Sequence, residues 1–231
     1  MKCLEIVDMS YRYDGSNNTV LSGINAIFES GKVYTIIGES GAGKSTLLSL
    51  ISGLDVCKDG DILYNGNSLR KLDRDEYRAK SVGVIFQGYN LLLNSTAIYN
   101  ITLSMNISGI SEPNKKEKAY ELLEKVGIDR ETANRKILRL SGGEQQRVGI
   151  ARALSHNPDV IIADEPTGNL DGETEKAVLD ILSRLAHDEG KCVIIVTHSE
   201  NVTAVADEVI GIRGGRLLSG EEYHSEISIC E

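Results

Sequence analysis

The chain has 231 residues, of which 41% are hydrophobic and 26% are charged, and this composition is typical of one globular domain with a sizeable core. Its formal net charge of −9 argues against nucleic acid as a partner, because phosphate backbones require clustered Lys and Arg. The cysteines are widely separated and no signal-peptide pattern is present, so we expect a reducing, cytoplasmic compartment. No apolar stretch approaches the ~20 residues that span a bilayer.

The first part of the chain predicts antiparallel strands that lead to a glycine-rich loop. Residues 3–13 alternate loosely between apolar and polar side chains, and a second run covers residues 20–28. Turn-forming residues at positions 14–18 separate the two runs. Tyr11 is a candidate for stacking on an adenine ring through its aromatic face. Packing of Tyr11 within the strand is an equally good interpretation of the local sequence.

The glycine-rich loop lies between an apolar run at residues 33–37 and a helical pattern that begins at Thr46. Its spacing, G-x-x-x-x-G-K-S, predicts a phosphate-binding loop in this strand–loop–helix context. The motif is Gly38-Glu39-Ser40-Gly41-Ala42-Gly43-Lys44-Ser45. Glycines let the backbone wrap around a polyphosphate, and N–H groups at a helix N-terminus attract the anion. Lys44 would contact the β- and γ-phosphates and the Ser45 hydroxyl would coordinate Mg²⁺, so the motif predicts nucleoside triphosphate binding.

The next segment predicts a hairpin, a short helix and a buried strand that ends in a polar side chain. Residues 61–64 with the turn Asn65-Gly66 indicate the hairpin, and residues 72–80 indicate the helix. Residues 82–86 form an apolar run that is followed at once by Gln87. Because ligands bind at the carboxyl ends of parallel strands in open α/β sheets, Gln87 is a candidate binding residue. A glutamine in a solvent-facing loop is the alternative.

Residues 88–156 have a different character, which predicts a helical subdomain inserted between two strands of the main sheet. Helices are predicted at residues 97–106 and 115–126, and the second has its apolar residues on one face. No strong strand pattern occurs in this segment before residue 159.

The helical segment ends in a pattern that predicts a further helix start. Ser141 and Glu144 have the spacing of a capping box. Gly142 and Gly143 lie beside this cap and leave backbone N–H groups uncovered, which makes a second anion-binding surface. Capping without anion binding explains the local sequence equally well.

The apolar run at residues 160–163 leads into two acidic residues. It predicts a buried strand whose carboxyl end places Asp164 near the phosphate loop, where Asp164 could hold Mg²⁺ together with Ser45. The adjacent Glu165 is placed to orient or deprotonate a water molecule. A turn residue is the alternative for an isolated carboxylate at a strand end.

A second apolar run, at residues 192–196, leads into His198. A histidine there could donate to a terminal phosphate or to the attacking water, although a structural role is the more common one. A turn ending at Asp171 precedes an amphipathic helix at residues 174–188. The final segments predict a closing hairpin at residues 208–212 and 216–218 and a polar tail at residues 219–231.

Together, these motifs resemble those of the ATP-binding subunits of ABC transporters over nearly the whole chain. The order and approximate spacing match for the phosphate loop, Gln87, Leu140-Ser141-Gly142-Gly143-Glu144, Asp164-Glu165, Gly168 to Asp171 and His198. The stretch at 140–144 discriminates best, because many unrelated NTPases share the lysine and acid motifs. Residues 86–92 and 163–171 are most similar to the branch that serves lipoprotein release, macrolide or antimicrobial-peptide export, and cell division. Glu144 departs from the glutamine that is commonest in the family.

The resemblance implies a role for each matching residue. Glu165 would be the general base, with His198, Gln87 and Lys44 completing the catalytic set. Ser45, Gln87 and Asp164 would serve Mg²⁺. Tyr11 would stack on adenine, since it fits the family spacing better than Tyr13. The expected ATP-binding residues are Tyr11, Gly38, Ser40, Gly41, Gly43, Lys44, Ser45, Thr46, Ser141, Gly142, Gly143 and Asp171.

The implied fold is α/β: a P-loop NTPase core with a mainly parallel sheet, an N-terminal antiparallel β subdomain and an inserted helical subdomain. We expect one domain, with residues 1–87 and 157–231 forming the core and residues 88–156 the helical part. The implied partners are a second copy of the chain in an ATP-sandwich dimer and separately encoded transmembrane permease subunits. We therefore expect a Mg-dependent ATPase at the cytoplasmic face of the membrane, soluble when isolated. A non-transport ATPase that signals through a membrane partner, of the cell-division or peptide-sensing type, is the alternative.

Overall fold

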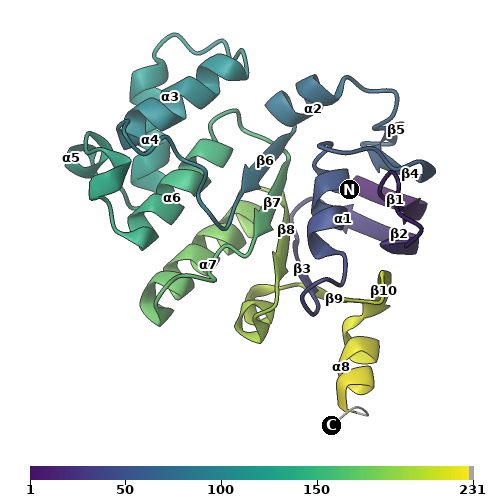
Figure 1. Cartoon of the computed structure of the whole chain (residues 1–231). Helices are drawn as coiled ribbons and strands as arrows, with labels where there is room; N and C mark the ends of the chain where they lie inside the picture. The colour runs from purple at the N-terminus through teal and green to yellow at the C-terminus, as the bar shows by residue number, and fades with distance from the viewer. Residues whose placement is uncertain (229–231) are drawn as a thin grey trace.

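The computed structural model describes residues 1–228 and contains two β-sheets (Figure 1). The first sheet is antiparallel, with the order β2-β1-β4-β5. Its strands are β1 (Lys2–Tyr11), β2 (Leu21–Glu29), β4 (Asp59–Tyr64) and β5 (Asn67–Ser68). Alternate apolar residues such as Leu4 and Ile6 point into the core because successive side chains of a strand face opposite sides.

The second sheet has the order β10-β9-β3-β8-β7-β6 and is parallel except for β10. Its strands are β3 (Val33–Ile37), β6 (Val82–Ile85), β7 (Val160–Asp164), β8 (Cys192–Thr197), β9 (Glu208–Arg213) and β10 (Arg216–Ser219). The central strands are apolar along nearly their whole length because elements cover both faces of the sheet. The carboxyl ends of the parallel strands meet at one edge.

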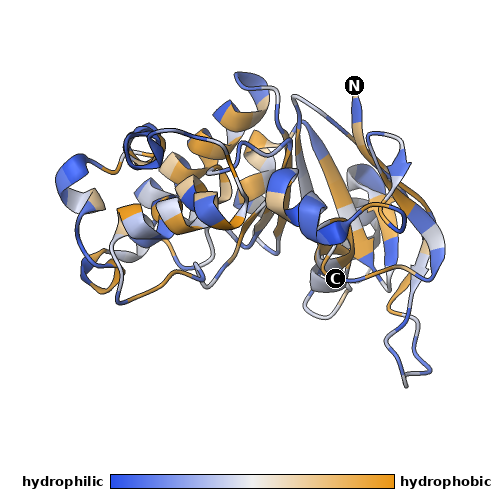
Figure 2. Ribbon diagram, turned by 90° about the horizontal axis from the view of Figure 1, so that it is seen from above, coloured by the Kyte–Doolittle hydropathy of each residue, from blue (hydrophilic) through white to orange (hydrophobic). Residues whose placement is uncertain are grey.

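Two hydrophobic cores lie on the two faces of this parallel sheet. On one face, residues such as Ile161 and Ile195 pack with α7 (Gly172–His187) and the helical segment. On the other face, their sequence neighbours Ile162 and Ile194 pack with α1 (Lys44–Ile51) and the antiparallel sheet. The short helix α2 (Arg74–Lys80) covers the end near β6. In Figure 2 the apolar residues accordingly concentrate on the strands and on the inner sides of the helices.

The segment between β6 and β7 is helical and lies to one side of the sheet (Figure 1). It contains α3 (Ala97–Ile107), α4 (Lys115–Lys125), α5 (Arg130–Ala133), the 3₁₀ turn η1 (Ile137–Arg139) and α6 (Gly142–Ala153). Ser141 caps α6 as predicted, because its side chain and that of Glu144 form the reciprocal bonds of a capping box.

The strands and long helices expected from the sequence are confirmed, including the closing hairpin, but the prediction of a polar tail after residue 219 is wrong for residues 220–228. Instead of a polar tail, Gly220–Ser228 form the helix α8, which follows the hairpin, and a 3₁₀ turn η2 (Glu200–Val205) precedes β9. Tyr223 anchors α8, because its ring packs directly on the backbone of Gly211 in β9. Cys230 lies outside the described residues. Within residues 1–228, no helix combines the length and apolar character needed to cross a bilayer.

Candidate functional site

A cavity of about 560 Å³ lies where the parallel strands end, and it brings together most of the predicted site residues. The phosphate loop follows β3, Gln87 follows β6, Asp164 ends β7 and His198 follows β8. The lining residues are Tyr13, Val20, Ser40, Gly41, Gly43, Lys44, Ser45, Thr46, Gln87, Asp164, Glu165 and His198. A larger cavity of about 790 Å³ lies between α4 and α7 and is lined by other residues of the described chain.

The phosphate loop has the backbone geometry that its glycines allow. Gly41 and Gly43 have φ angles of 83° and 109°, which L side chains rarely adopt. Gly38 has no room for a side chain, because a Cβ there would lie 2.5 Å from the carbonyl oxygen of Ile212. The Lys44 ammonium donates hydrogen bonds to the carbonyl oxygens of Gly38 (2.6 Å) and Glu39 (2.9 Å). Lys44 thus spans the loop, with its charge beside the N-terminus of α1.

Asp164 is the half-buried carboxylate of the cavity. Burial, reinforced by the adjacent Glu165, raises the pKa of Asp164, and Lys44 only partly offsets this. Among the described residues, no basic side chain forms an ion pair with Asp164. A buried carboxylate of this kind is stabilised by a cation. Carboxylate, hydroxyl and amide oxygens from Asp164, Ser45 and Gln87 line the same cavity, and this donor set fits Mg²⁺.

Both carboxylate oxygens of Glu165 have hydrogen-bond partners on β8 and the residue after it. The Thr197 hydroxyl donates to Oε2 (2.8 Å), and the His198 Nδ1 lies 2.7 Å from Oε1. Glu165 itself has a φ of 45°, an uncommon value for a residue other than glycine, and its side chain is 12% exposed. The strand-end backbone and two side chains therefore fix where this carboxylate points into the cavity.

Tyr11, the residue that we expect to stack on adenine, does not offer an open ring face in this structure. Tyr11 is only 7% exposed, and its hydroxyl donates to the Asp55 carboxylate. Burial and this carboxylate together raise the pKa of Tyr11. Tyr13, in contrast, is 48% exposed, lines the cavity of the phosphate loop and lies with its ring nearly perpendicular to that of Tyr11. The position of the two rings was not visible in the sequence because Tyr13 lies in the loop after β1.

Six predicted residues do not line the cavity: Gly38 and Tyr11, described above, and Ser141, Gly142, Gly143 and Asp171. Ser141 accepts a hydrogen bond from the N–H of Glu144 (3.3 Å), and the Ser141 N–H donates to the Glu144 carboxylate (2.7 Å). Asp171 caps α7 by accepting bonds from the Thr174 N–H (3.0 Å) and hydroxyl (2.9 Å).

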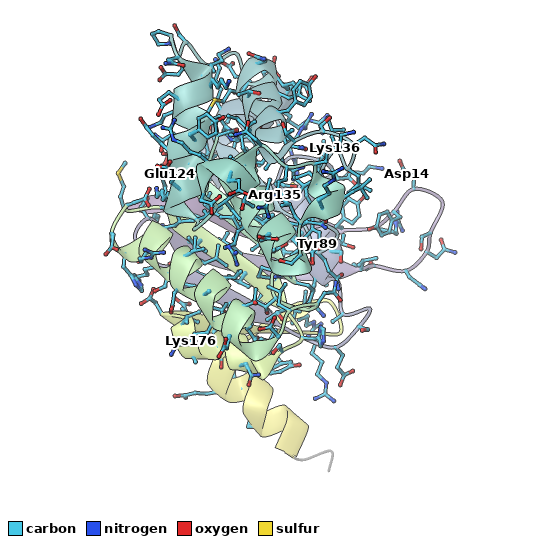
Figure 3. The ribbon with its side chains drawn as sticks, turned by 90° about the vertical axis from the view of Figure 1, so that its left-hand side faces the viewer. Asp14, Tyr89, Glu124, Arg135, Lys136 and Lys176 are labelled. Atoms are coloured by element: carbon cyan, nitrogen blue, oxygen red, sulfur yellow. The ribbon has the colours of Figure 1, made fainter. Side chains whose placement is uncertain are left out.

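The N-termini of α6 and α7 are in direct contact through Gly143 and Thr174, since a Cβ on Gly143 would approach the Thr174 methyl to under 3.0 Å. Tyr89 also approaches the α6 N-terminus, where its hydroxyl would lie 3.2 Å from a Cβ on Gly142. Figure 3 shows Tyr89 on the same side of the molecule as Arg135 and Lys136.

Sequence reasoning missed two of these contacts. Thr197 directly follows the apolar run of β8, and its position at a strand end was the available signal. The Gly143–Thr174 contact joins segments that are 31 positions apart in the chain. The available signal was the glycine pair beside the cap, because glycines allow close packing as well as anion binding.

Comparison with known proteins identifies the family. Residues 21–168 match the family model described as ABC transporter. An uncharacterized ABC transporter ATP-binding protein of Bacillus subtilis, YclH, is 46% identical over 96% of this chain and 98% of its own length. The macrolide export ATP-binding/permease protein MacB of Mannheimia succiniciproducens is 40% identical over 97% of this chain and 35% of its own length. A dimeric, post-hydrolysis structure of the ATP-binding cassette MJ0796 with ADP and Pi has a TM-score of 0.84 and 31% identity, with 94% of this chain and 98% of the cassette covered. The chain therefore belongs to the ATP-binding proteins of the ABC transporter family.

Proposed function

We propose that the protein hydrolyses ATP and that this reaction powers a membrane transporter. The observation that carries this proposal is the convergence of the phosphate loop, Asp164, Glu165 and His198 on one cavity. A polyphosphate fits at the N-terminus of α1, where backbone N–H groups and Lys44 supply positive charge. The solved cassette with ADP and Pi supports the same reaction in a relative.

The proposed chemistry is the in-line attack of water on the γ-phosphorus of ATP. Glu165 would accept the proton of the water, because the bonds to Thr197 and His198 hold its carboxylate at a fixed place in the cavity. His198 would orient Glu165 and contact the γ-phosphate. Ser45, Gln87 and Asp164 would hold Mg²⁺, which supplies neutralisation of phosphate charge when bound.

Two substitutions test this chemistry. Glu165→Gln should abolish ATP turnover while ATP binding remains, because the amide keeps the shape of the side chain and cannot accept the proton. Lys44→Ala should weaken the binding of ATP itself. A phosphate-release assay and a calorimetric ATP titration on both variants separate the two effects. Turnover at the wild-type rate in Glu165→Gln, or unchanged ATP affinity in Lys44→Ala, would contradict the assignments.

We also propose that two copies of the chain complete the nucleotide sites. The exposed N-terminus of α6, with Ser141, Gly142 and Gly143, offers N–H groups to an anion but does not line the cavity of its own chain. A head-to-tail dimer would place these residues on the γ-phosphate of the nucleotide in the opposite copy. The solved structures of the MJ0796 cassette are dimeric, which supports a dimer of this chain.

The surface that we propose for docking to a permease is an apolar patch formed by Leu92, Leu93 and Leu138. All three side chains are exposed, and the N–H of Leu138 donates to the carbonyl oxygen of Leu93 (3.2 Å). Leu92 and Leu93 lie just after Gln87 in the chain, so a bound partner could act on the cavity through this loop. Docking would hold the protein at the cytoplasmic face of the membrane. Leu93→Glu should reduce co-purification with the permease without changing ATP binding by the isolated chain, and undiminished co-purification would contradict the placement.

A further inference from the structure

Tyr13 makes a contact that the proposed reaction does not use. Its hydroxyl lies 2.9 Å from the Oγ1 of Thr46, in the first turn of α1. Both residues line the cavity of the phosphate loop. The Thr46 hydroxyl lies at a helix N-terminus, where a bound phosphate chain would also need it as a hydrogen-bond donor. Either hydroxyl can donate in this bond, and where Thr46 donates, Tyr13 and a phosphate oxygen are alternative acceptors for the same proton.

The same side chain also covers Tyr11. The two ring centroids are 5.1 Å apart and the planes are nearly perpendicular, with an interplanar angle of 88°. Tyr11 is buried within the core of the antiparallel sheet, while about half of Tyr13 is open to solvent. Because the two rings are in edge-to-face contact, displacement of Tyr13 would uncover part of the Tyr11 ring.

The loop that carries Tyr13 is held to the rest of the protein by few and weak contacts, so it can move. The ion pair of this loop joins Asp14 and Lys58, and both side chains are exposed to solvent. Such pairs add little to stability because water screens the two charges. Gly15, beside Asp14, has a φ of 79°, and no described residue other than its two chain neighbours lies within 4 Å of its Cβ position, so neighbouring side chains do not block a change in its backbone conformation. The loop is also held by the Tyr13–Thr46 hydrogen bond and by two backbone hydrogen bonds. The N–H of Ser16 donates to the carbonyl oxygen of Tyr13, and the N–H of Val20 donates to that of Tyr11.

We propose that Tyr13 is a displaceable cover of the nucleotide site. Its hydroxyl competes with the phosphates of the nucleotide for Thr46, and its ring shields Tyr11 until the nucleotide enters. Binding exchanges the Tyr13–Thr46 hydrogen bond for a phosphate–Thr46 bond and turns the phenol ring outward. The inference rests on the proposed nucleotide site and adds the residue that regulates access to it.

The first test is a calorimetric titration of the Tyr13→Phe variant of the full chain with Mg-ATP and with inorganic tripolyphosphate. This variant loses the hydroxyl and keeps the ring. Both affinities should rise about threefold to tenfold, the factor expected from the net contribution of one hydrogen bond. Tyr99→Phe is the matched control, because Tyr99 is an exposed tyrosine on α3. Its affinities should equal those of the wild type.

The second test measures the exposure of Tyr11 by nitration with tetranitromethane and mass spectrometry. Tyr11 should react slowly in the wild type and in Tyr13→Phe, where a ring still covers it, and several-fold faster in Tyr13→Ala. Unchanged or weaker tripolyphosphate affinity in Tyr13→Phe would contradict the proposal that Tyr13 covers the nucleotide site. Equal nitration of Tyr11 in all three proteins would contradict it as well. Failure of the wild type to bind either ligand would instead overturn the nucleotide site on which the inference rests.

Discussion

Replacing Gly143 by alanine tests the contact that positions the α6 N-terminus. The added Cβ would approach the Thr174 methyl to under 3.0 Å, whereas carbon atoms in contact prefer ~3.5–4.0 Å. Thr174 cannot easily turn away, because its hydroxyl bonds to Asp171 (2.9 Å) and its branched side chain has few rotamers. Overpacking of this kind costs about 1–3 kcal/mol. For a domain of this size we expect the melting temperature to fall by about 2–12 °C.

A substitution at Thr174 tests whether the predicted loss of stability arises from the contact with Gly143. Thr174→Ser removes the methyl that Gly143→Ala would strike and keeps the hydroxyl that bonds to Asp171. In the Thr174→Ser background, Gly143→Ala should therefore cost less than about 1 kcal/mol, which leaves a coupling energy of roughly 1–2 kcal/mol. Thermal unfolding of the four proteins, followed by circular dichroism, measures the cycle. Equal losses of stability in both backgrounds would refute the packing argument.

Three further substitutions test other parts of the account. Asp164→Asn should raise the melting temperature, and the difference from the wild type should grow between pH 4 and pH 7. The pKa of Asp164 is higher in the folded state than the unfolded value near 3.8, so ionisation of Asp164 destabilises the folded protein as the pH rises above that value. An advantage that does not vary with pH would contradict the burial of this charge. Ser141→Ala should cost about 1 kcal/mol in a urea titration, because α6 loses its cap, and an unchanged midpoint would contradict it. Gly211→Ala should release α8 by displacing Tyr223, which faster proteolysis near residue 220 would detect; wild-type resistance to protease would count against the docking of this helix.

The strand-end residues of the cavity could be predicted from the sequence because parallel strands bring their carboxyl ends together. Gln87 and Asp164 come directly after apolar runs and His198 comes directly after the strand that ends in Thr197, so their convergence on the phosphate loop follows from strand order. The capping box at Ser141 was equally visible, because its two residues lie within one helical turn.

The features that escaped prediction depend on contacts between distant segments or on loop conformation. Tyr11 and Tyr13 are two positions apart, and their exposure depends on how the loop after β1 folds back onto α1. The helix α8 has a polar composition, and the surface that holds it is the bare backbone of Gly211 under Tyr223. No local pattern in the sequence encodes either contact.

In the proposed dimer, two copies of the chain close around ATP, and each supplies Ser141–Gly143 to the other. The most direct test is the mass of Glu165→Gln in solution, measured by size-exclusion chromatography with light scattering in saturating Mg-ATP. ADP in place of ATP, and the Lys44→Ala/Glu165→Gln double variant, serve as controls and should give single chains. Glu165→Gln with Mg-ATP should have the mass of two chains. A mass of one chain under that condition would contradict the proposed dimer.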